Sequence, residues 1–260
     1  MELLLALPVG HAVPHGCPVT AAHMAYRVGP GPRLLGIRLP EGPLGGLMYL
    51  DCAGFEGGGD CAPCASQILG ECRRREFRGI VCDFEGLPDP CLSQMAALLD
   101  RGCAGEGWRL LVPEAYAAAA PGAMVLISSA VTAGSLERRL TAARDRWGAA
   151  RPALAVEWLR EDFLLPAEGR GCAVSQQALE EQLHRLQPAT FFDRGLCAHY
   201  YTYMGPGGQA HFVLFDTVRS VQAKLAVARR LELPAALLAE PEVTACLDKL
   251  VCPQQAGGPA

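Results

Sequence analysis

The chain has 260 residues, of which 50% are hydrophobic, 19% charged and 7% aromatic, and its formal net charge is −4. This apolar content is ample for a buried core, so global disorder is excluded. The slightly acidic balance lacks the basic surface that nucleic-acid binders need, so we expect no nucleic-acid partner. No apolar run reaches the 18 residues of a membrane-spanning helix, and we expect no membrane partner.

The N-terminal residues predict a buried strand and not a secretory signal, because no basic segment precedes their short apolar stretch. We therefore expect a cytoplasmic protein. The twelve cysteines lie along the chain without a repeating spacing. Several occupy apolar positions, where a free cysteine packs as a small hydrophobe. In a cytoplasmic protein we expect reduced thiols.

Short apolar runs, typical of buried parallel strands, alternate with helical patterns along the chain. The expected strands are Leu3–Leu7, Leu34–Leu39, Leu47–Asp51, Gly79–Phe84, Trp108–Val112, Ala123–Ser128, Ala153–Trp158 and Ala235–Ala239. The expected helices are Ala21–Arg27, Pro63–Arg74, Leu92–Arg101, Tyr116–Ala120, Leu136–Trp147, Ser175–Leu186 and Val218–Leu231. Ser135 and Ser175 are placed to cap the N-termini of two of these helices.

About eight strand–helix steps in one chain are the number that a closed (β/α)8 barrel needs. An open doubly wound sheet is the alternative. Aromatic residues concentrate in Tyr200–Phe215, a hairpin that turns at Gly205–Gly208. We predict an α/β fold, a TIM barrel forming a single domain over residues 1–252, with this aromatic hairpin inserted before the last helix and strand. Residues 253–260 are expected to be a flexible C-terminal tail.

The most informative stretch is Phe77–Gly86, a buried strand that ends in acidic residues. Strand periodicity places Val81, Asp83 and Glu85 on one face. In a barrel, the C-terminal ends of the strands hold the catalytic groups. Two carboxylates close together there repel each other, which raises one pKa and suits that group to act as a general acid. The alternative is a buried polar pair that arginine or backbone groups satisfy.

This stretch resembles the Asp-x-x-Asp-x-Asp-x-Glu signature on the fourth strand of glycoside hydrolase family 18, the chitinase-like barrels. Ala210–Leu225 looks like the family's last segment, in which an aromatic strand and an Asp lead to a Ser-x-x-x-Lys helix before the final strand. The resemblance covers residues 45–240 and is closest to the branch of spore-cortex and peptidoglycan N-acetylglucosaminidases. It therefore also implies an association with spores.

The resemblance implies that Glu85 is the general acid that protonates the glycosidic oxygen. It implies that Asp83 orients and stabilises the 2-acetamido group of the substrate. In this family the acetamido oxygen attacks the anomeric carbon, so the substrate must be an N-acetylated sugar. We expect a carbohydrate partner and neither a metal nor a cofactor; the oligomeric state is left open.

The sequence also departs from the family pattern. Arg78 and Val81 replace the first two acids of the signature. At the end of the sixth strand the family has a Tyr-Asp pair, for which this chain offers at best Ser129 and Ala130. The usual Trp is absent from the last strand. Losing one such stabilising group typically costs about 10²–10³ in rate. The loss of several predicts a degenerate active site whose activity is weak, altered or absent.

Other residues are candidates for substrate binding. They are Ser129, His11 after the first strand, Trp158 near the end of the seventh strand, and Tyr201 and Tyr203 in the hairpin. Each has a plainer reading, since alternating aromatics are ordinary sheet packing and a loop histidine can simply be solvated.

Two functions therefore remain open. The first is a retaining, substrate-assisted glycoside hydrolase that acts on a glycan containing N-acetylglucosamine, such as peptidoglycan, spore cortex or a chitin-like polymer. The second is a catalytically impaired barrel that binds such a glycan, or a protein partner, without cleaving it. A thiol-dependent regulator that uses Cys61 and Cys64 is a minor third possibility, against two incidental cysteines at a helix start.

Overall fold

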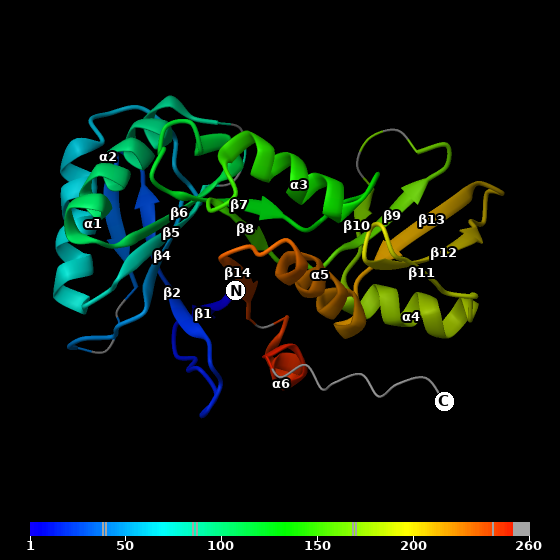
Figure 1. Ribbon diagram of the computed structural model, residues 1–260. Coiled ribbons are helices and arrows are strands. Elements are labelled where there is room, and N and C mark those ends of the chain that lie inside the picture. Colours follow the sequence, from blue (N-terminus) through cyan, green and yellow to red (C-terminus); the bar gives the residue numbers. More distant parts are fainter. Residues whose placement is uncertain are drawn as a thin grey trace.

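The computed structural model describes residues 1–251 except 38, 40, 85, 87, 168, 170 and 241. In this part of the chain, eight parallel strands close into a barrel (Figure 1). They are β1 (Glu2–Pro8), β2 (Thr20–Gly29), β4 (Leu47–Asp51), β5 (Gly79–Asp83), β6 (Arg109–Pro113), β7 (Met124–Ser128), β8 (Pro152–Ala155) and β14 (Ala235–Ala239). Around the ring they follow the order β1-β14-β8-β7-β6-β5-β4-β2, and β2 pairs with β1 to close it. The predicted barrel is therefore confirmed.

Alternate residues of each strand fill the inside of the barrel, as a parallel barrel with a packed interior requires. The buried members of this inner core are Leu4, Ala6, Ala22, Leu47, Tyr49, Val81, Leu111, Ala153, Ala235 and Leu237. At the N-terminal end of the strands, an ion pair between Glu2 and Arg109 closes the interior. In a parallel barrel, catalytic and binding groups gather at the opposite, C-terminal end of the strands.

Helices cover most of the outside of the barrel. They are α1 (Ala62–Arg75), α2 (Pro90–Glu106), α3 (Leu136–Trp147), α5 (Val218–Arg230) and α6 (Leu247–Val251), with short 3₁₀ turns at Glu114–Tyr116 and Thr244–Cys246. Residues 9–19, which connect β1 to β2, contain no helix. Within the described ranges, no helix is long and apolar enough to cross a membrane.

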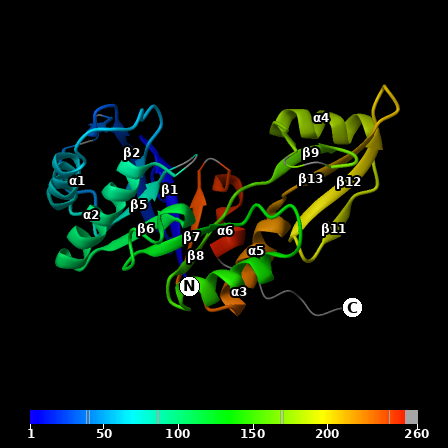
Figure 2. The ribbon, with the colours of Figure 1, turned by 90° about the horizontal axis from the view of Figure 1, so that it is seen from above.

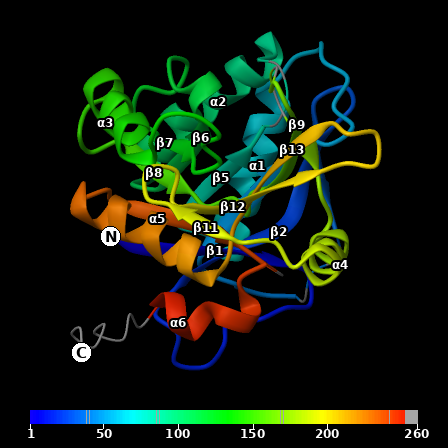
Figure 3. The same ribbon diagram turned by 90° about the vertical axis from the view of Figure 1, so that its right-hand side faces the viewer.

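An antiparallel sheet with one helix is inserted between β8 and α5 (Figures 1 and 2). Its strands are β9 (Arg160–Leu164), β10 (Cys172–Ala173), β11 (Phe191–Asp193), β12 (Ala198–Met204) and β13 (Ala210–Phe215), in the order β10-β9-β13-β12-β11. Helix α4 (Gln176–Leu186) packs on one face of this sheet (Figure 3). The predicted aromatic hairpin is confirmed as β12 and β13, and it belongs to a larger insertion than expected.

Two predicted elements in the N-terminal part are wrong. The expected helix Ala21–Arg27 is part of β2, and the expected barrel strand Leu34–Leu39 is instead the short β3 (Arg33–Gly36), which pairs antiparallel with β2. The count of eight barrel strands was right only because these two errors offset each other. Thr20–Gly29 has only two β-branched residues, Thr20 and Val28, so its strand conformation comes from pairing with β1 and β4.

Both predicted serine caps are confirmed. The Ser135 hydroxyl accepts a hydrogen bond from the Arg138 backbone, and the Ser175 hydroxyl accepts one from the Ala178 backbone. The seventh barrel strand is shorter than predicted, since β8 ends at Ala155 and Trp158 lies beyond it. The predicted C-terminal tail, residues 253–260, lies outside the described residues.

Candidate functional site

A hollow of about 430 Å³ opens at the C-terminal ends of β2, β4 and β5. Its lining residues come from these strands and from the loops that follow them: Met24, Tyr49, Asp51, Cys52, Ala53, Asp83 and Gly86. This is the end of a parallel barrel at which catalytic and binding groups gather. The hollow is therefore the first candidate site, and we call it the Asp83 hollow.

Asp83 is the last residue of β5, and its side chain lies on the inner face of the strand with that of Val81. The next side chain, Phe84, is buried on the outer face and packs edge-on against Tyr116, with ring centroids 5.5 Å apart. Gly86 then turns the chain with a φ of 88°, in the left-handed region that favours glycine. The anchored Phe84 and the turn fix the strand end, and thereby the direction of the Asp83 carboxyl.

Two residues on β4 face Asp83. The Tyr49 hydroxyl donates a hydrogen bond to Asp83 Oδ2 at 2.6 Å. Asp51 lies directly opposite Asp83 in the register of the two strands. The carboxyl of Asp83 is thus held by one neutral donor and faces a second carboxyl.

Arg27 reaches Asp51 because β2 contains a bulge. Met24 pairs with Tyr49, but the next pairs are Tyr26 with Leu50 and Arg27 with Asp51, so that Ala25 is the extra residue. The Arg27 Nε donates to Asp51 Oδ1 at 2.7 Å, and the same oxygen accepts a hydrogen bond from the Ala53 backbone. These two hydrogen bonds to Oδ1 hold the Asp51 carboxylate at the rim of the hollow.

The pKa of Asp83 is raised above its ordinary value. Burial is the largest cause, the negative charge of Asp51 adds to it, and the hydrogen bond from Tyr49 opposes it. A carboxyl with a raised pKa retains its proton further toward neutral pH, and it can then donate as well as accept a hydrogen bond. The arrangement is suited to binding a polar group of a ligand and to sharing a proton with it.

Glu85, the predicted general acid, lies outside the described residues. Two other predicted binding residues lie away from the Asp83 hollow. Ser129 is fully buried, and its hydroxyl accepts a hydrogen bond from the Glu157 backbone N–H at 2.9 Å. Trp158 is partly buried and packs against the apolar cluster beneath α3 and α5.

Tyr201 and Tyr203 lie in the inserted sheet. Tyr201 is fully buried against α4, and its hydroxyl donates to Gln182 Oε1 at 2.9 Å. The Tyr203 hydroxyl donates to Asp162 Oδ2 at 2.7 Å, and its ring stacks on His211. Both hydroxyls are therefore engaged within the insertion.

His11 follows β1 and lines a separate, smaller hollow. Met24 lines both hollows, so they are neighbours along the same end of the barrel. His11 thus lines a hollow that shares one lining residue, Met24, with the Asp83 hollow.

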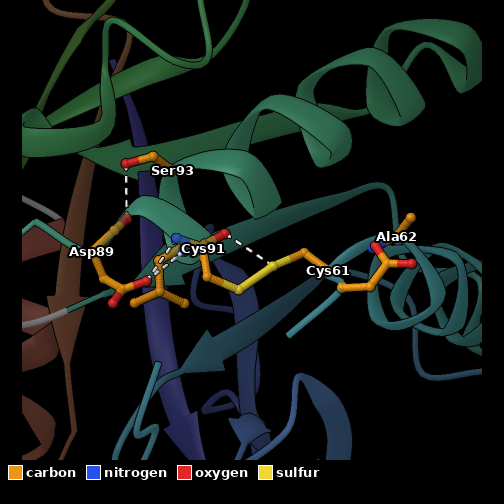
Figure 4. The surroundings of a disulfide bond; sticks show 7 residues. Cys61, Ala62, Asp89, Cys91 and Ser93 are labelled. Atoms are coloured by element: carbon orange, nitrogen blue, oxygen red, sulfur yellow. Dashed lines mark hydrogen bonds between the residues drawn. A yellow bond between two sulfur atoms is a disulfide. The ribbon is translucent and has the colours of Figure 1, made fainter. Parts of the chain in front are cut away.

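Two cysteines form a disulfide, where the sequence predicted reduced thiols. Cys61, at the start of α1, forms a disulfide with Cys91 in the first turn of α2 (Figure 4). Cys64 is buried and is not part of this bond. The Asp89 side chain caps α2 by accepting hydrogen bonds from the Cys91 and Leu92 backbones. The prediction of reduced thiols is wrong for this pair. Cys61 and Cys91 are 30 residues apart, and no sequence pattern indicates that the ends of the two loops before α1 and α2 meet.

No group of three or more His, Cys, Asp or Glu side chains in the described ranges is arranged to hold a metal ion. The residues that sequence reasoning missed are Tyr49, Asp51, Met24 and Arg27. The sequence contained one indication of Tyr49 and Asp51. The strand Leu47–Asp51 ends in a carboxylate as β5 does, and alternation puts Tyr49 and Asp51 on the same face.

No family model matches the chain, and no curated protein matches it in sequence. Its fold does match solved structures. A chitinase from Chromobacterium violaceum superposes with a TM-score of 0.67 at 18% identity, over 98% of this chain and 99% of the other. The spore cortex-lytic enzyme SleL of Bacillus megaterium gives a TM-score of 0.61 at 15% identity, over 92% of this chain and 70% of the other.

A third match is a family 18 chitinase from the plant Cycas revoluta, solved in complex with (GlcNAc)3. Its TM-score is 0.56 at 13% identity, over 96% of this chain and 97% of the other. At such identities the likeness concerns the fold. The chain is thus structurally similar to family 18 chitinases and to spore cortex-lytic enzymes, as the sequence motifs predicted.

Proposed function

We propose that this protein is a glycoside hydrolase that acts on a glycan containing N-acetylglucosamine. The observation that carries the proposal is the Asp83 carboxyl, which lies in an open hollow at the C-terminal end of the barrel, held by Tyr49 and facing Asp51. The fold supports the proposal, because the solved structures that share it are named as chitinases and cortex-lytic enzymes.

In the proposed reaction the protein supplies an acid and a positioning group. Glu85 protonates the glycosidic oxygen as the bond to the leaving sugar breaks. Asp83 accepts a hydrogen bond from the acetamido N–H and so orients the acetamido oxygen toward the anomeric carbon. That oxygen forms the new bond, and water later opens the resulting ring with retention of configuration. Tyr49 holds Asp83 in position throughout.

A second candidate function is glycan binding without cleavage. It is favoured by Ser129, which stands where the resemblance places an acetamido-binding pair, because its buried hydroxyl is already engaged with the Glu157 backbone. A site that lacks one partner of the acetamido group would still bind the sugar. It would stabilise the transition state less.

The test compares hydrolysis of a chromogenic chitobiose and of purified peptidoglycan by the wild type, Glu85→Gln and Asp83→Asn. Glu180→Gln, an exposed carboxylate on α4, is the matched control. The proposal predicts turnover in the wild type and control, and a loss of at least about 10²-fold in both site variants. Binding by calorimetry without turnover would establish the second function. Absence of both would reject a glycan as the ligand.

A further inference from the structure

A loop of residues 52–60 connects β4 to α1 and contributes to the lining of the Asp83 hollow. Cys52 and Ala53, at the start of the loop, line the hollow. The Ala53 backbone N–H donates a hydrogen bond to Asp51 Oδ1 at 2.9 Å, and Asp51 lies opposite Asp83. The position of this loop therefore affects both the shape of the hollow and the orientation of Asp51. We call it the glycine loop.

The glycine loop has little packing of its own. Of residues 53–60, only Phe55 and Gly57 are partly buried, and the others are exposed. The three successive glycines Gly57–Gly59 have φ values of 79°, 73° and 89°, in the left-handed region that residues with a side chain rarely adopt. Because such a backbone is permissive and few side chains hold it, the loop depends on its two ends for its position.

The C-terminal end of the glycine loop is anchored by the disulfide between Cys61 and Cys91 (Figure 4). This bond ties it to the loop before α2, which carries Gly86 of the hollow. The two loops also touch where a Cβ atom at Gly57 would lie 3.2 Å from Asp89 Oδ2. The helices α1 and α2 pack through a common apolar cluster. Breaking the disulfide would therefore release the loops and leave the helices in place.

We propose that the disulfide between Cys61 and Cys91 is a redox switch for the Asp83 hollow. In the oxidised state it holds the glycine loop in position. Reduction by a low-molecular-weight thiol such as glutathione releases the loop and loosens this side of the hollow. The switch goes beyond the proposed function, because it concerns the shape of the hollow whatever ligand the hollow takes.

The exchange is a two-electron reduction in two steps. It begins at Cys91, which is 8% exposed, because Cys61 is fully enclosed. A glutathione thiolate attacks Cys91 Sγ and forms a mixed disulfide, and the Cys61 thiolate leaves at the N-terminus of α1, where the helix dipole favours negative charge. A second glutathione thiolate attacks the glutathione sulfur, which releases the Cys91 thiolate and glutathione disulfide. Each protein thiolate takes up one proton, and glutathione disulfide reverses the sequence.

The neighbouring thiols do not compete for this bond. Cys64 follows Cys61 in a Cys-x-x-Cys spacing and is the obvious rival partner. It is fully buried, and burial raises the pKa of its thiol to about 11, so that it stays protonated and unreactive. Burial also raises the pKa of three further thiols in the same cluster, those of Cys72, Cys82 and Cys103. The exchange is therefore confined to Cys61 and Cys91.

The test equilibrates the whole protein in mixtures of reduced and oxidised glutathione. Peptide mapping by mass spectrometry measures the bond between Cys61 and Cys91. NMR follows the Ala53 methyl in the hollow, with Ala153 of the inner barrel core as the internal control. Amide hydrogen exchange follows Phe55, whose N–H is hydrogen-bonded within the loop. We expect reduction to break the bond, to shift Ala53 but not Ala153, and to speed exchange at Phe55 at least about tenfold.

Variants assign this response to the two cysteines. Cys61→Ser/Cys91→Ser should show the reduced-state signals of Ala53 and Phe55 in every mixture. Cys172→Ser, which removes an exposed thiol from the inserted sheet, is the matched control and should respond as the wild type does. Amides in the middle of α1 and α2 should keep their protection in both redox states, since these helices pack in the core.

Several outcomes would overturn the switch. One is absence of the bond in oxidised glutathione. Another is its persistence in excess reduced glutathione, which would make it a permanent cross-link. Reduction without a change at Ala53 and Phe55 would overturn it as well, and so would faster exchange throughout α1 and α2.

The proposed function is judged separately, by turnover of a chromogenic chitobiose in the same mixtures. Turnover that falls on reduction would support both the hydrolase and the switch. No turnover in either redox state, with the changes at Ala53 and Phe55 present, would count against the hydrolase and leave the switch standing.

Discussion

Tyr49 and Asp83 lie on neighbouring barrel strands, and the Tyr49 hydroxyl donates a hydrogen bond to the Asp83 carboxyl at 2.6 Å. Asp83 is otherwise in a setting that disfavours its charge, because it is largely buried and faces Asp51. The hydrogen bond from Tyr49 opposes this effect, favours the ionised carboxylate and holds the carboxyl in one direction. Tyrosine is suited to this task, since its ring packs in the barrel interior while its hydroxyl reaches the rim.

Tyr49→Phe should raise the pKa of Asp83. The hydroxyl stabilises the ionised carboxylate, so its removal shifts the balance toward the protonated acid. A carbon-detected NMR titration of the Asp83 carboxyl measures the shift. Tyr203→Phe, which removes a hydroxyl from Asp162 in the inserted sheet, is the control and should leave Asp83 unchanged. An unaltered Asp83 titration in Tyr49→Phe would contradict the assigned role.

Asp83→Asn should stabilise the protein at neutral pH. A raised pKa means that the folded state binds the Asp83 proton more tightly than the unfolded chain does. Ionisation of Asp83 therefore lowers the free energy of unfolding as pH rises above the ordinary carboxyl range. The variant should gain on the order of 1 kcal/mol at pH 7 and lose this advantage near pH 3, where both states are protonated.

Urea denaturation at the two pH values measures this difference. Asp145→Asn, an exposed carboxylate on α3, is the control and should change stability by less than about 0.5 kcal/mol. A variant that is less stable than the wild type at pH 7 would show that the charge of Asp83 is better compensated than its neighbours indicate.

The sequence predicted the barrel because seven of its eight strands are continuous apolar runs. It mistook β2 for a helix because the residues between Thr20 and Val28 are not β-branched. Only the pairing of β2 with β1 and β4 shows that it is a strand. That error also hid Met24 and Arg27, which reach the site through a bulge that no local pattern signals. Which strands pair, and in which register, depends on residues that are distant in the sequence, so no local pattern shows it.

For the candidate site, the sequence identified Asp83 from its place at a strand end. It missed Tyr49, because a tyrosine in an apolar run resembles a core residue unless the acidic end of its strand is also taken into account. The same limit applies to Tyr201 and Tyr203, which the sequence offered as hairpin aromatics for substrate binding. The contacts with α4 and Asp162 that engage them join elements distant in the chain.

A buried ion pair links the barrel to the inserted sheet. Lys224 on α5 and Asp216 after β13 contact each other with fully buried side chains, and Asp216 Oδ2 also accepts a hydrogen bond from the Leu159 backbone. Lys224→Met would leave the Asp216 charge buried without its cation. We expect a loss of about 3–5 kcal/mol in the free energy of unfolding.

The double variant Lys224→Met with Asp216→Asn should recover part of this loss, because it removes the uncompensated charge. Arg230→Ala, which breaks an exposed pair with Glu137, is the control and should cost less than about 1 kcal/mol. Thermal denaturation of the four proteins measures these values. Equal losses in Lys224→Met and Arg230→Ala would contradict the buried character of the pair.

The disulfide between Cys61 and Cys91 should stabilise the loops around the Asp83 hollow. It joins the starts of α1 and α2 (Figure 4), and the loops that lead to these helices carry Ala53 and Gly86. A cross-link between residues 30 apart contributes about 3.6 kcal/mol by restricting the unfolded chain. A reducing agent should therefore lower the urea midpoint of the wild type and of the control Cys64→Ser. It should not lower that of Cys61→Ser/Cys91→Ser, which should already unfold at the reduced midpoint. An equal effect of the reductant on the double variant would assign the stabilisation to other cysteines.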